Sequence, residues 1–218
     1  MIAEARKAFW VMVAFLAVLW ILQIFNALDH YAITDQHSIV ARDVGSLPAI
    51  FTAPFLHGSW AHIEGNSGPL FIFGFLAAYR GVKKFLGVSL LIIIVSGLGA
   101  WLISASGSGT VGASGVIFGY LGYVLVRGIF DRHRIDIVIG LVMALCFAYQ
   151  FTDLLPQNNT VSWQAHMFGF AAGIIGGWFF REKRPKKAKA ALADTTPAPL
   201  PAPLFDPTTT LLDKPKQT

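Results

Sequence analysis

Long runs of apolar residues alternate with short clusters of charge along this chain of 218 residues. A bilayer core of about 30 Å takes roughly 20 helical residues, which is the scale of these runs. We predict six membrane-spanning helices, at residues 8–28, 62–79, two within the charge-free stretch 85–126, 137–152 and 162–180. Gly and Ser at residues 104–112 indicate the loop between the third and fourth helices. The predicted fold class is therefore all-α, a polytopic membrane bundle of six transmembrane helices.

The positions of the basic residues predict the orientation, because Lys and Arg favour the cytoplasmic side of a membrane. With six spans, 16 of the 17 Lys and Arg residues fall on one side, and Arg42 alone falls on the other. Both termini are expected in the cytoplasm of a multi-pass protein of a bacterial plasma membrane, and no cleavable signal peptide is evident. This pattern accounts for the net charge of +5, so no nucleic-acid partner is expected.

The composition excludes a soluble cytosolic enzyme. Hydrophobic residues make up 55% of the chain and charged residues 13%, whereas soluble domains carry about 25% charged residues. The single cysteine, Cys146, excludes a disulfide framework and a zinc site built from several cysteines.

Two regions fall outside a plain bundle. Residues 29–61 form a long external loop whose uncharged part, 44–61, contains Pro48 and Pro54 and is therefore not expected to be an α-helix. We expect this loop to lie partly embedded at the membrane surface. The membrane domain is assigned to residues 1–181. Residues 182–218 are interpreted as a disordered cytoplasmic tail whose basic residues contact the lipid bilayer.

The first candidate group lies at the outer end of the second span, in the sequence His57-Gly-Ser-Trp-Ala-His62-Ile-Glu-Gly-Asn66. His62 and Asn66 are four residues apart and share one helix face. Polar groups within a span are costly in lipid, which makes them candidates for function. The alternative is a polar helix end at the membrane surface.

The second group, Gly112-Ala-Ser114-Gly115, opens the fourth span. From Ser114 to Arg127 the helix is about 20 Å long, whereas a full crossing needs about 30 Å. Ser114 is thus expected roughly 10 Å below the outer surface, where irregular backbone is tolerated only inside protein or beside a water-filled cavity. We expect residues 104–113 to dip inward and deliver Ser114 to a buried, wet pocket. The alternative is a serine that caps a helix.

The third group contains His166, a lone ionisable residue in the sixth span. Small residues one turn apart let two helices approach closely. Such helix-packing faces occur on the sixth and fourth spans, at Gly169 and Gly173, and at Gly115, Gly119 and Gly122. If the faces meet, His166 and Ser114 come within hydrogen-bond reach. The alternative is that the glycines only pack and His166 bonds a nearby carbonyl group.

Taken together, the three groups predict an acyl-transfer site. Ser114 is a nucleophile that needs a base, and His166 can supply it. Asn66 and His62 are donors for an oxyanion, next to the Ser114 backbone N–H. Asp153 lies 13 residues before His166, and nothing in the sequence places its carboxylate against the imidazole, so no Ser-His-acid triad is expected.

Two other classes explain the polar residues less well. His57, His62 and His166 would supply three ligands for a metal, but the His-Glu-x-x-His spacing of metalloproteases is absent, and no metal or cofactor is expected. A transporter would be expected to show internal repeats, which are not evident here.

These motifs jointly resemble the rhomboid intramembrane serine proteases over about residues 45–181. The motifs are His-x4-His-x3-Asn at 57–66, Gly-x-Ser-Gly at 112–115 and Ala-His-x-x-Gly-x-x-x-Gly at 165–173. The resemblance implies a catalytic dyad of Ser114 and His166. It also implies an oxyanion hole formed by His62, Asn66 and the Ser114 N–H.

The resemblance further implies supporting roles for neighbouring residues. His57 matches a position that supports the site and its water, and Gly112 belongs to the serine motif. Phe118 stands where many members have a Tyr under the catalytic His, so the aromatic face is kept and the hydroxyl is lost. Pro48-Ala49 replaces the Trp-Arg of the first loop of many members.

The function implied is cleavage of single-pass or polytopic membrane proteins near the outer leaflet, through an acyl-enzyme. The resemblance implies substrates with a helix-destabilised segment and a small residue before the cut. The alternative is a non-proteolytic rhomboid-like scaffold or dislocation factor. The presence of both Ser114 and His166 argues against that alternative.

Overall fold

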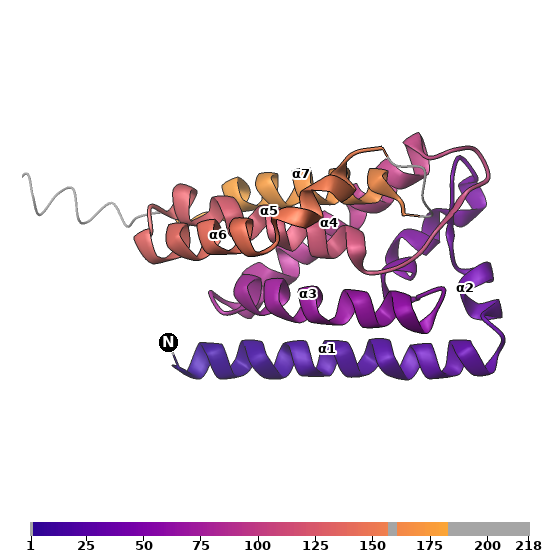
Figure 1. The fold of residues 1–218 in the computed structure, drawn as a ribbon, viewed down its shortest axis with the longest axis horizontal. Helices are drawn as coiled ribbons and strands as arrows, with labels where there is room; N and C mark the ends of the chain where they lie inside the picture. The colour runs from indigo at the N-terminus through magenta and orange to yellow at the C-terminus, as the bar shows by residue number, and fades with distance from the viewer. Residues whose placement is uncertain (1, 157–160, 183–218) are drawn as a thin grey trace, which may run out of the picture. The chain divides into compact units, whose positions relative to one another are not determined.

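The computed structural model describes residues 2–156 and 161–182 and forms a bundle of helices. Its long helices are α1 (Ile2–Leu28), α3 (Trp60–Ala78), α4 (Val82–Ile103), α5 (Ser114–Asp131), α6 (Arg134–Cys146) and α7 (Trp163–Phe179). α1 lies beside α3, and α5 contacts α3, α4, α6 and α7, so α5 forms the centre of the bundle (Figure 1). Helices thus occur in all six predicted ranges. The predicted tail lies outside the described residues, apart from its first position.

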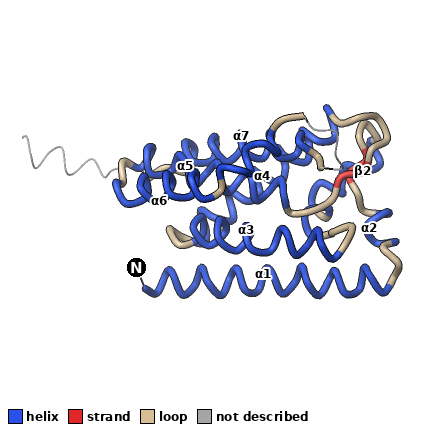
Figure 2. The backbone as a smooth tube through the Cα atoms, viewed as in Figure 1, coloured by secondary structure: helices blue, strands red, loops and turns tan. Residues whose placement is uncertain are grey.

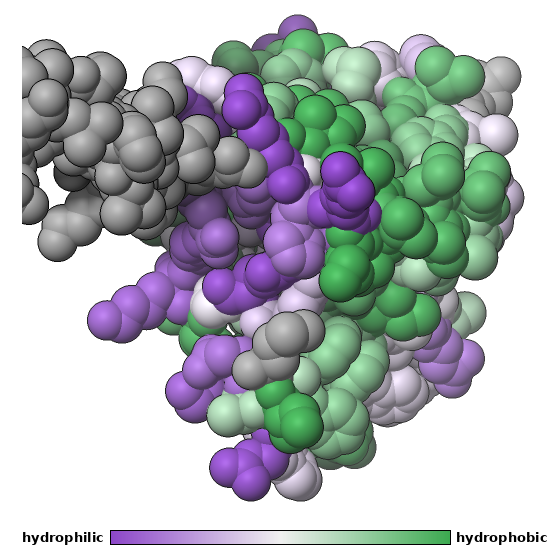
Figure 3. Space-filling view, turned by 90° about the vertical axis from the view of Figure 1, so that its left-hand side faces the viewer, coloured by the Kyte–Doolittle hydropathy of each residue, from purple (hydrophilic) through white to green (hydrophobic). Residues whose placement is uncertain are grey.

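The outward faces of the bundle are apolar. Trp10 and Ile21 of α1 and Leu141 and Leu145 of α6 are all more than half exposed. Hydrophilic side chains gather instead on the end of the bundle where α1 begins, next to a hydrophobic flank (Figure 3). This separation of apolar flank from polar end is typical of a protein whose helices contact lipid.

Three of the described helices are long and apolar enough to cross a membrane, namely α1, α4 and α5. A fourth span results if α6 and the 3₁₀ helix η3 (Ala148–Leu154) are taken together. α7 has 17 residues, about 25 Å of helix, which is shorter than a bilayer core. The architecture is therefore a mostly helical bundle with several apolar helices, and the count of six spans stays a prediction.

The fifth predicted span is not one continuous helix, so the expectation for residues 137–152 is wrong in this respect. α6 ends at Cys146, and η3 continues from it at an angle of 73°. Phe147, at the break, packs its ring against Phe73 of α3 with the centroids 4.7 Å apart. The bend directs η3 onto α7. Apolar residues stand on both sides of the break, so the hydropathy pattern conceals it.

The loop between α1 and α3 is ordered by short elements. It contains α2 (Ala32–Gln36), strand β1 (Ile39–Val40) and the 3₁₀ helices η1 (Val44–Phe51) and η2 (Ala53–Phe55). The expectation that residues 44–61 avoid an α-helix is confirmed up to Ser59, because α3 begins at Trp60. β1 pairs antiparallel with β2 (Gly109–Thr110), which the sequence did not predict (Figure 2). This pairing ties the loop to the segment that precedes Ser114.

Arg127 lies inside the bundle, although its sequence position suggested a charge between two spans. Its side chain is 1% exposed, and its guanidinium lies 3.2 Å from the carboxylate of Asp136, which is equally buried. Arg127 also donates to the carbonyl oxygen of Leu76 at 2.6 Å, and Arg80 lies 2.7 Å from the same carboxylate. The cluster links α3, α5 and α6 at one end of the bundle.

Candidate active site

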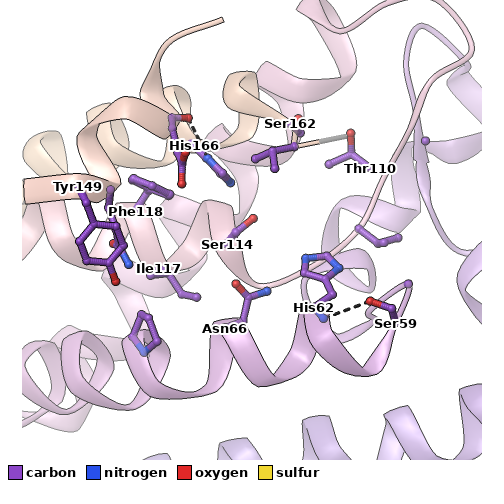
Figure 4. Close-up of a pocket in the computed structure, with 18 residues that line it drawn as sticks. Ser59, His62, Asn66, Thr110, Ser114, Ile117, Phe118, Tyr149, Ser162 and His166 are labelled. Carbon is purple, nitrogen blue, oxygen red and sulfur yellow. Dashed lines mark hydrogen bonds between the residues drawn. The ribbon is translucent and has the colours of Figure 1, made fainter. Parts of the chain in front are cut away.

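A cavity of about 680 Å³ lies between α3, α5, η3 and α7. Five of the predicted site residues line it, namely His62, Asn66, Ser114, Phe118 and His166. Figure 4 shows His62 and Asn66 rising from α3 on one side, His166 on the opposite side, and Ser114 between them. The fold thus brings together residues that are up to 104 positions apart in the sequence.

Ser114 is the first residue of α5, as expected from the interpretation that the motif at residues 112–115 opens the fourth span. The preceding segment is held by the β1–β2 pair and by the Gly112 N–H, which donates to the carbonyl oxygen of Ala53 at 2.9 Å. Gly112 has φ +111, and a Cβ placed there would lie 2.6 Å from the imidazole of His62. Only glycine fits both the backbone conformation and the space. The turn therefore brings the backbone at Gly112, two residues before Ser114, close to the His62 ring.

His166 lies in the first turn of α7, where Ser162 caps the helix by accepting a hydrogen bond from the Ala165 N–H. Its Nδ1 atom is 3.0 Å from the backbone carbonyl oxygen of Asp153. A carbonyl oxygen only accepts, so Nδ1 carries the proton and Nε2 has a free lone pair. Nε2 is buried and has no hydrogen-bond partner within the described residues. The histidine is thereby held in the tautomer that a general base requires.

Phe118, one turn into α5, stacks on His166 with a centroid distance of 4.3 Å and an interplanar angle of 23°. The stacking restricts the orientation of the imidazole ring from the face, while Asp153 restricts it from the edge.

No hydrogen bond joins Ser114 to His166 in the part of the chain that the structure describes. Catalytic hydrogen bonds are often longer before substrate binds, so this separation is compatible with a dyad.

His62 and Asn66 occupy one face of α3, one turn apart. The helix is started by Ser59, whose hydroxyl accepts a hydrogen bond from the His62 N–H at 3.1 Å. The Asn66 Nδ2 atom is buried and has no partner among the described residues, although Asn66 lines the cavity. A buried amide donor without a partner is unfavourable unless a ligand or water satisfies it. Asn66 can therefore donate to an oxygen that develops charge next to Ser114.

His57 lies behind the cavity and is fully buried. Its ring meets His62 edge-on with the centroids 4.9 Å apart, and its Nε2 atom is 3.5 Å from the Ala113 N–H. Burial, assisted by the charge of His62, lowers the pKa of His57 to about 3, so its imidazole is neutral. Asn26 of α1 donates to the His57 carbonyl oxygen at 3.0 Å. His57 thus touches both His62 and the segment that carries Ser114.

The glycine faces of α5 and α7 meet directly. A Cβ at Gly169 would overlap the carbonyl oxygen of Gly115, and a Cβ at Gly173 would overlap that of Gly119. Ser96 of α4 donates to the carbonyl oxygen of Ala165 at 2.8 Å and fixes the start of the same helix. The close approach of the two backbones brings Ser114 and His166 to the same cavity.

Two features of the site escaped the sequence reasoning. Asp153 contributes its main-chain carbonyl, which no residue type reveals. Asn26 is buried in α1 and bonds Thr34 as well as His57; an amide within an apolar span was the signal that could have identified it. Within residues 2–156 and 161–182, no three His, Cys, Asp or Glu side chains converge on a point where a metal ion could bind.

The chain is similar in sequence to several known proteins. The Rhomboid domain family matches residues 44–183. The uncharacterized Mycobacterium tuberculosis protein Rv1337 is 35% identical over 184 residues, which cover 81% of this chain and 76% of that protein. YdcA of Bacillus subtilis, provisionally named a rhomboid protease, is 25% identical over 178 residues, covering 78% of this chain and 87% of YdcA. With a family match across most of its length and these relatives, the chain belongs to the rhomboid family.

Proposed function

We propose that this protein is an intramembrane serine endopeptidase that cleaves membrane-protein substrates with Ser114 and His166. The observation that carries the proposal is the fixed tautomer of His166, whose Nδ1 faces the Asp153 carbonyl oxygen at 3.0 Å while its buried Nε2 has no partner among the described residues. That nitrogen belongs to a residue lining the same cavity as Ser114. A purely structural histidine would be expected to use both ring nitrogens.

The reaction follows from the positions of these groups. The Ser114 hydroxyl attacks the substrate carbonyl carbon while its proton passes to Nε2 of His166. The Nδ1–H bond to the Asp153 carbonyl stabilises the imidazolium that forms. Asn66, His62 and the Ser114 N–H donate to the oxyanion. The imidazolium then protonates the leaving amine, and water from the cavity hydrolyses the acyl-enzyme with the same histidine as base.

The topology is part of the proposal. Six spans with both termini in the cytoplasm place the cavity toward the outer leaflet, because α1 begins at the opposite end of the bundle (Figure 1). Family resemblance supports substrates that are single-pass or polytopic membrane proteins with a destabilised helical segment. A cysteine introduced at position 190 in a Cys146→Ser background should resist a membrane-impermeant thiol reagent in intact cells. External labelling there would contradict this topology.

Labelling with a fluorophosphonate probe tests the proposed chemistry directly. The purified protein should react covalently, and Ser114→Ala should remove the label because the probe bonds to an activated serine. His166→Ala should also remove it. Ser67→Ala is the matched control and should label normally, since Ser67 hydrogen-bonds Trp20 of α1 instead of lining the cavity. Absence of labelling in the folded wild-type protein would favour the scaffold alternative.

A further inference from the structure

A second groove, of about 430 Å³, lies on another side of the bundle, between α1 and α4. Its α1 wall is the stripe Val11, Ala14, Phe15 and Val18, which follows the helical period. Its α4 wall is formed by Phe85, Leu86, Ser89, Leu90 and Ile93, and its floor includes Val116 and Tyr120 of α5. Val18, Leu86 and Leu90 are each about half exposed, so the groove opens on the outer surface of two apolar helices.

The groove offers apolar contacts and almost no free polar group. Its two hydroxyls, on Ser89 and Tyr120, bond one another at 2.7 Å, and Ser89 also donates to the carbonyl oxygen of Phe85. A peptide backbone placed there as an extended segment would leave its N–H and C=O groups unsatisfied. A helix is about 10 Å across, so one turn of it alone would need roughly 400 Å³. The groove therefore fits a narrow apolar chain.

Basic residues continue both walls at one end. Lys7 lies four residues before Val11 on α1, and Lys83 lies three residues before Leu86 on α4, so each lysine falls on its groove-lining stripe. α1 and α4 begin at the same end of the bundle, where hydrophilic side chains gather (Figures 1 and 3). Lys7 pairs with the exposed Glu4 at 2.8 Å. Lys83 is exposed and makes no ion pair with the described residues.

The length of the groove matches one lipid leaflet. From Lys83 to Ile93 the helix rises about 15 Å, which is half of the roughly 30 Å bilayer core. We propose that an anionic phospholipid binds here, with its headgroup at Lys83 and Lys7 and one acyl chain in the groove. The far end of that chain contacts Phe55 and Ala113, and Ala113 directly precedes Ser114. The lipid thus supports the segment that carries Ser114 on the side facing away from the active-site cavity.

Native mass spectrometry of the detergent-purified protein can test this inference with two probes, phosphatidylglycerol and phosphatidylcholine. The wild-type protein should retain phosphatidylglycerol preferentially. Lys83→Gln should weaken that binding about fivefold, as expected for loss of one basic residue near an anionic headgroup. Ala14→Phe should fill the groove and abolish the preference. Ala17→Phe is the matched control, because Ala17 is exposed on α1 but does not line the groove, and should bind as the wild type does.

Each outcome decides the proposal. Equal retention of both lipids, or unchanged binding by Ala14→Phe, would overturn it. A protein dimer that Ala14→Phe dissociates without any lipid preference would assign the groove to a second copy of the chain and also overturn it. Binding is measured without substrate, so failure here leaves the proposed protease activity intact. Loss of fluorophosphonate labelling would likewise leave lipid binding unaffected.

Discussion

His166 is oriented by the main chain of Asp153: the imidazole Nδ1 lies 3.0 Å from the Asp153 carbonyl oxygen. A carbonyl fixes the tautomer as a carboxylate does, but it brings no full negative charge. Substitution of the Asp153 side chain, which leaves its main-chain carbonyl in place, therefore distinguishes a catalytic dyad from a triad.

Asp153→Asn should leave cleavage of a model transmembrane substrate close to the wild-type rate, since the substitution keeps the carbonyl. In a triad, the equivalent change lowers kcat by about 10⁴. The comparison requires initial rates in detergent on variants with unchanged melting behaviour. A rate loss of that size in folded Asp153→Asn protein would reject the dyad.

Asn66→Ala should lower the cleavage rate by about 10²–10³ while leaving the fold intact, because one oxyanion donor is removed and others remain. His62→Ala should act in the same direction. The effect should fall on kcat more than on KM, since the interaction forms in the transition state. Ser67→Ala, one position further along α3, serves as control. If Asn66→Ala cleaved as fast as this control, Asn66 would have no part in the oxyanion hole.

Gly112→Ala and Gly107→Ala form an informative pair, because both glycines have positive φ, at +111 and +76. Each change should cost about 1–2 kcal/mol of stability from backbone strain. Only Gly112→Ala should also remove most activity, because its Cβ would lie 2.6 Å from the His62 ring, whereas a Cβ at Gly107 meets nothing within 4 Å. Equal activity of the two folded variants would show that the contact with His62 is unimportant.

Gly169→Ala should destabilise the bundle by about 1–3 kcal/mol or more, because the new methyl group forces α5 and α7 apart. Gly176→Ala lies two turns further along the same helix, where a Cβ would meet Val88 at an ordinary 3.5 Å. That variant should unfold at nearly the wild-type temperature. Thermal unfolding in detergent measures both, and similar melting temperatures would argue against tight packing at Gly169.

Asp136→Ala should be strongly destabilising, by about 3–5 kcal/mol, because it leaves Arg127 buried without its carboxylate. Glu4→Ala breaks an ion pair that is exposed to solvent, with Lys7, and should cost less than about 1 kcal/mol. Unfolding measured under identical detergent conditions compares the two. A mild effect of Asp136→Ala would mean that water reaches Arg127.

The parts of this protein that sequence predicted are those governed by local pattern. Apolar runs with at most one charged residue located all six helical ranges, and the Gly and Ser content of residues 104–112 located the loop before α5. What escaped prediction depends on partners distant in the chain. β1 pairs with residues 69 and 71 positions away, and the buried Arg127 donates to the carbonyl oxygen of Leu76, 51 positions earlier in the chain.

Local hydropathy also failed at the break after Cys146, since a bend between two apolar segments leaves the pattern unchanged. The orientation of His166 escaped for a different reason. Every residue has a carbonyl group, so only the fold shows that Asp153 supplies the one that matters.

Because α6 and η3 meet at a 73° bend, η3 has two roles in the site that a straight helix would not combine. η3 forms part of the cavity wall through Tyr149, Gln150 and Asp153, and it also presents the carbonyl that holds the proton on Nδ1 of His166. A substrate that displaced η3 on entering would break the hydrogen bond between the Asp153 carbonyl oxygen and Nδ1 of His166. The imidazole would then no longer be oriented to act as a general base. Hydrolysis would then wait until η3 settled back over the occupied site, and substrates that prevent its return would remain uncut.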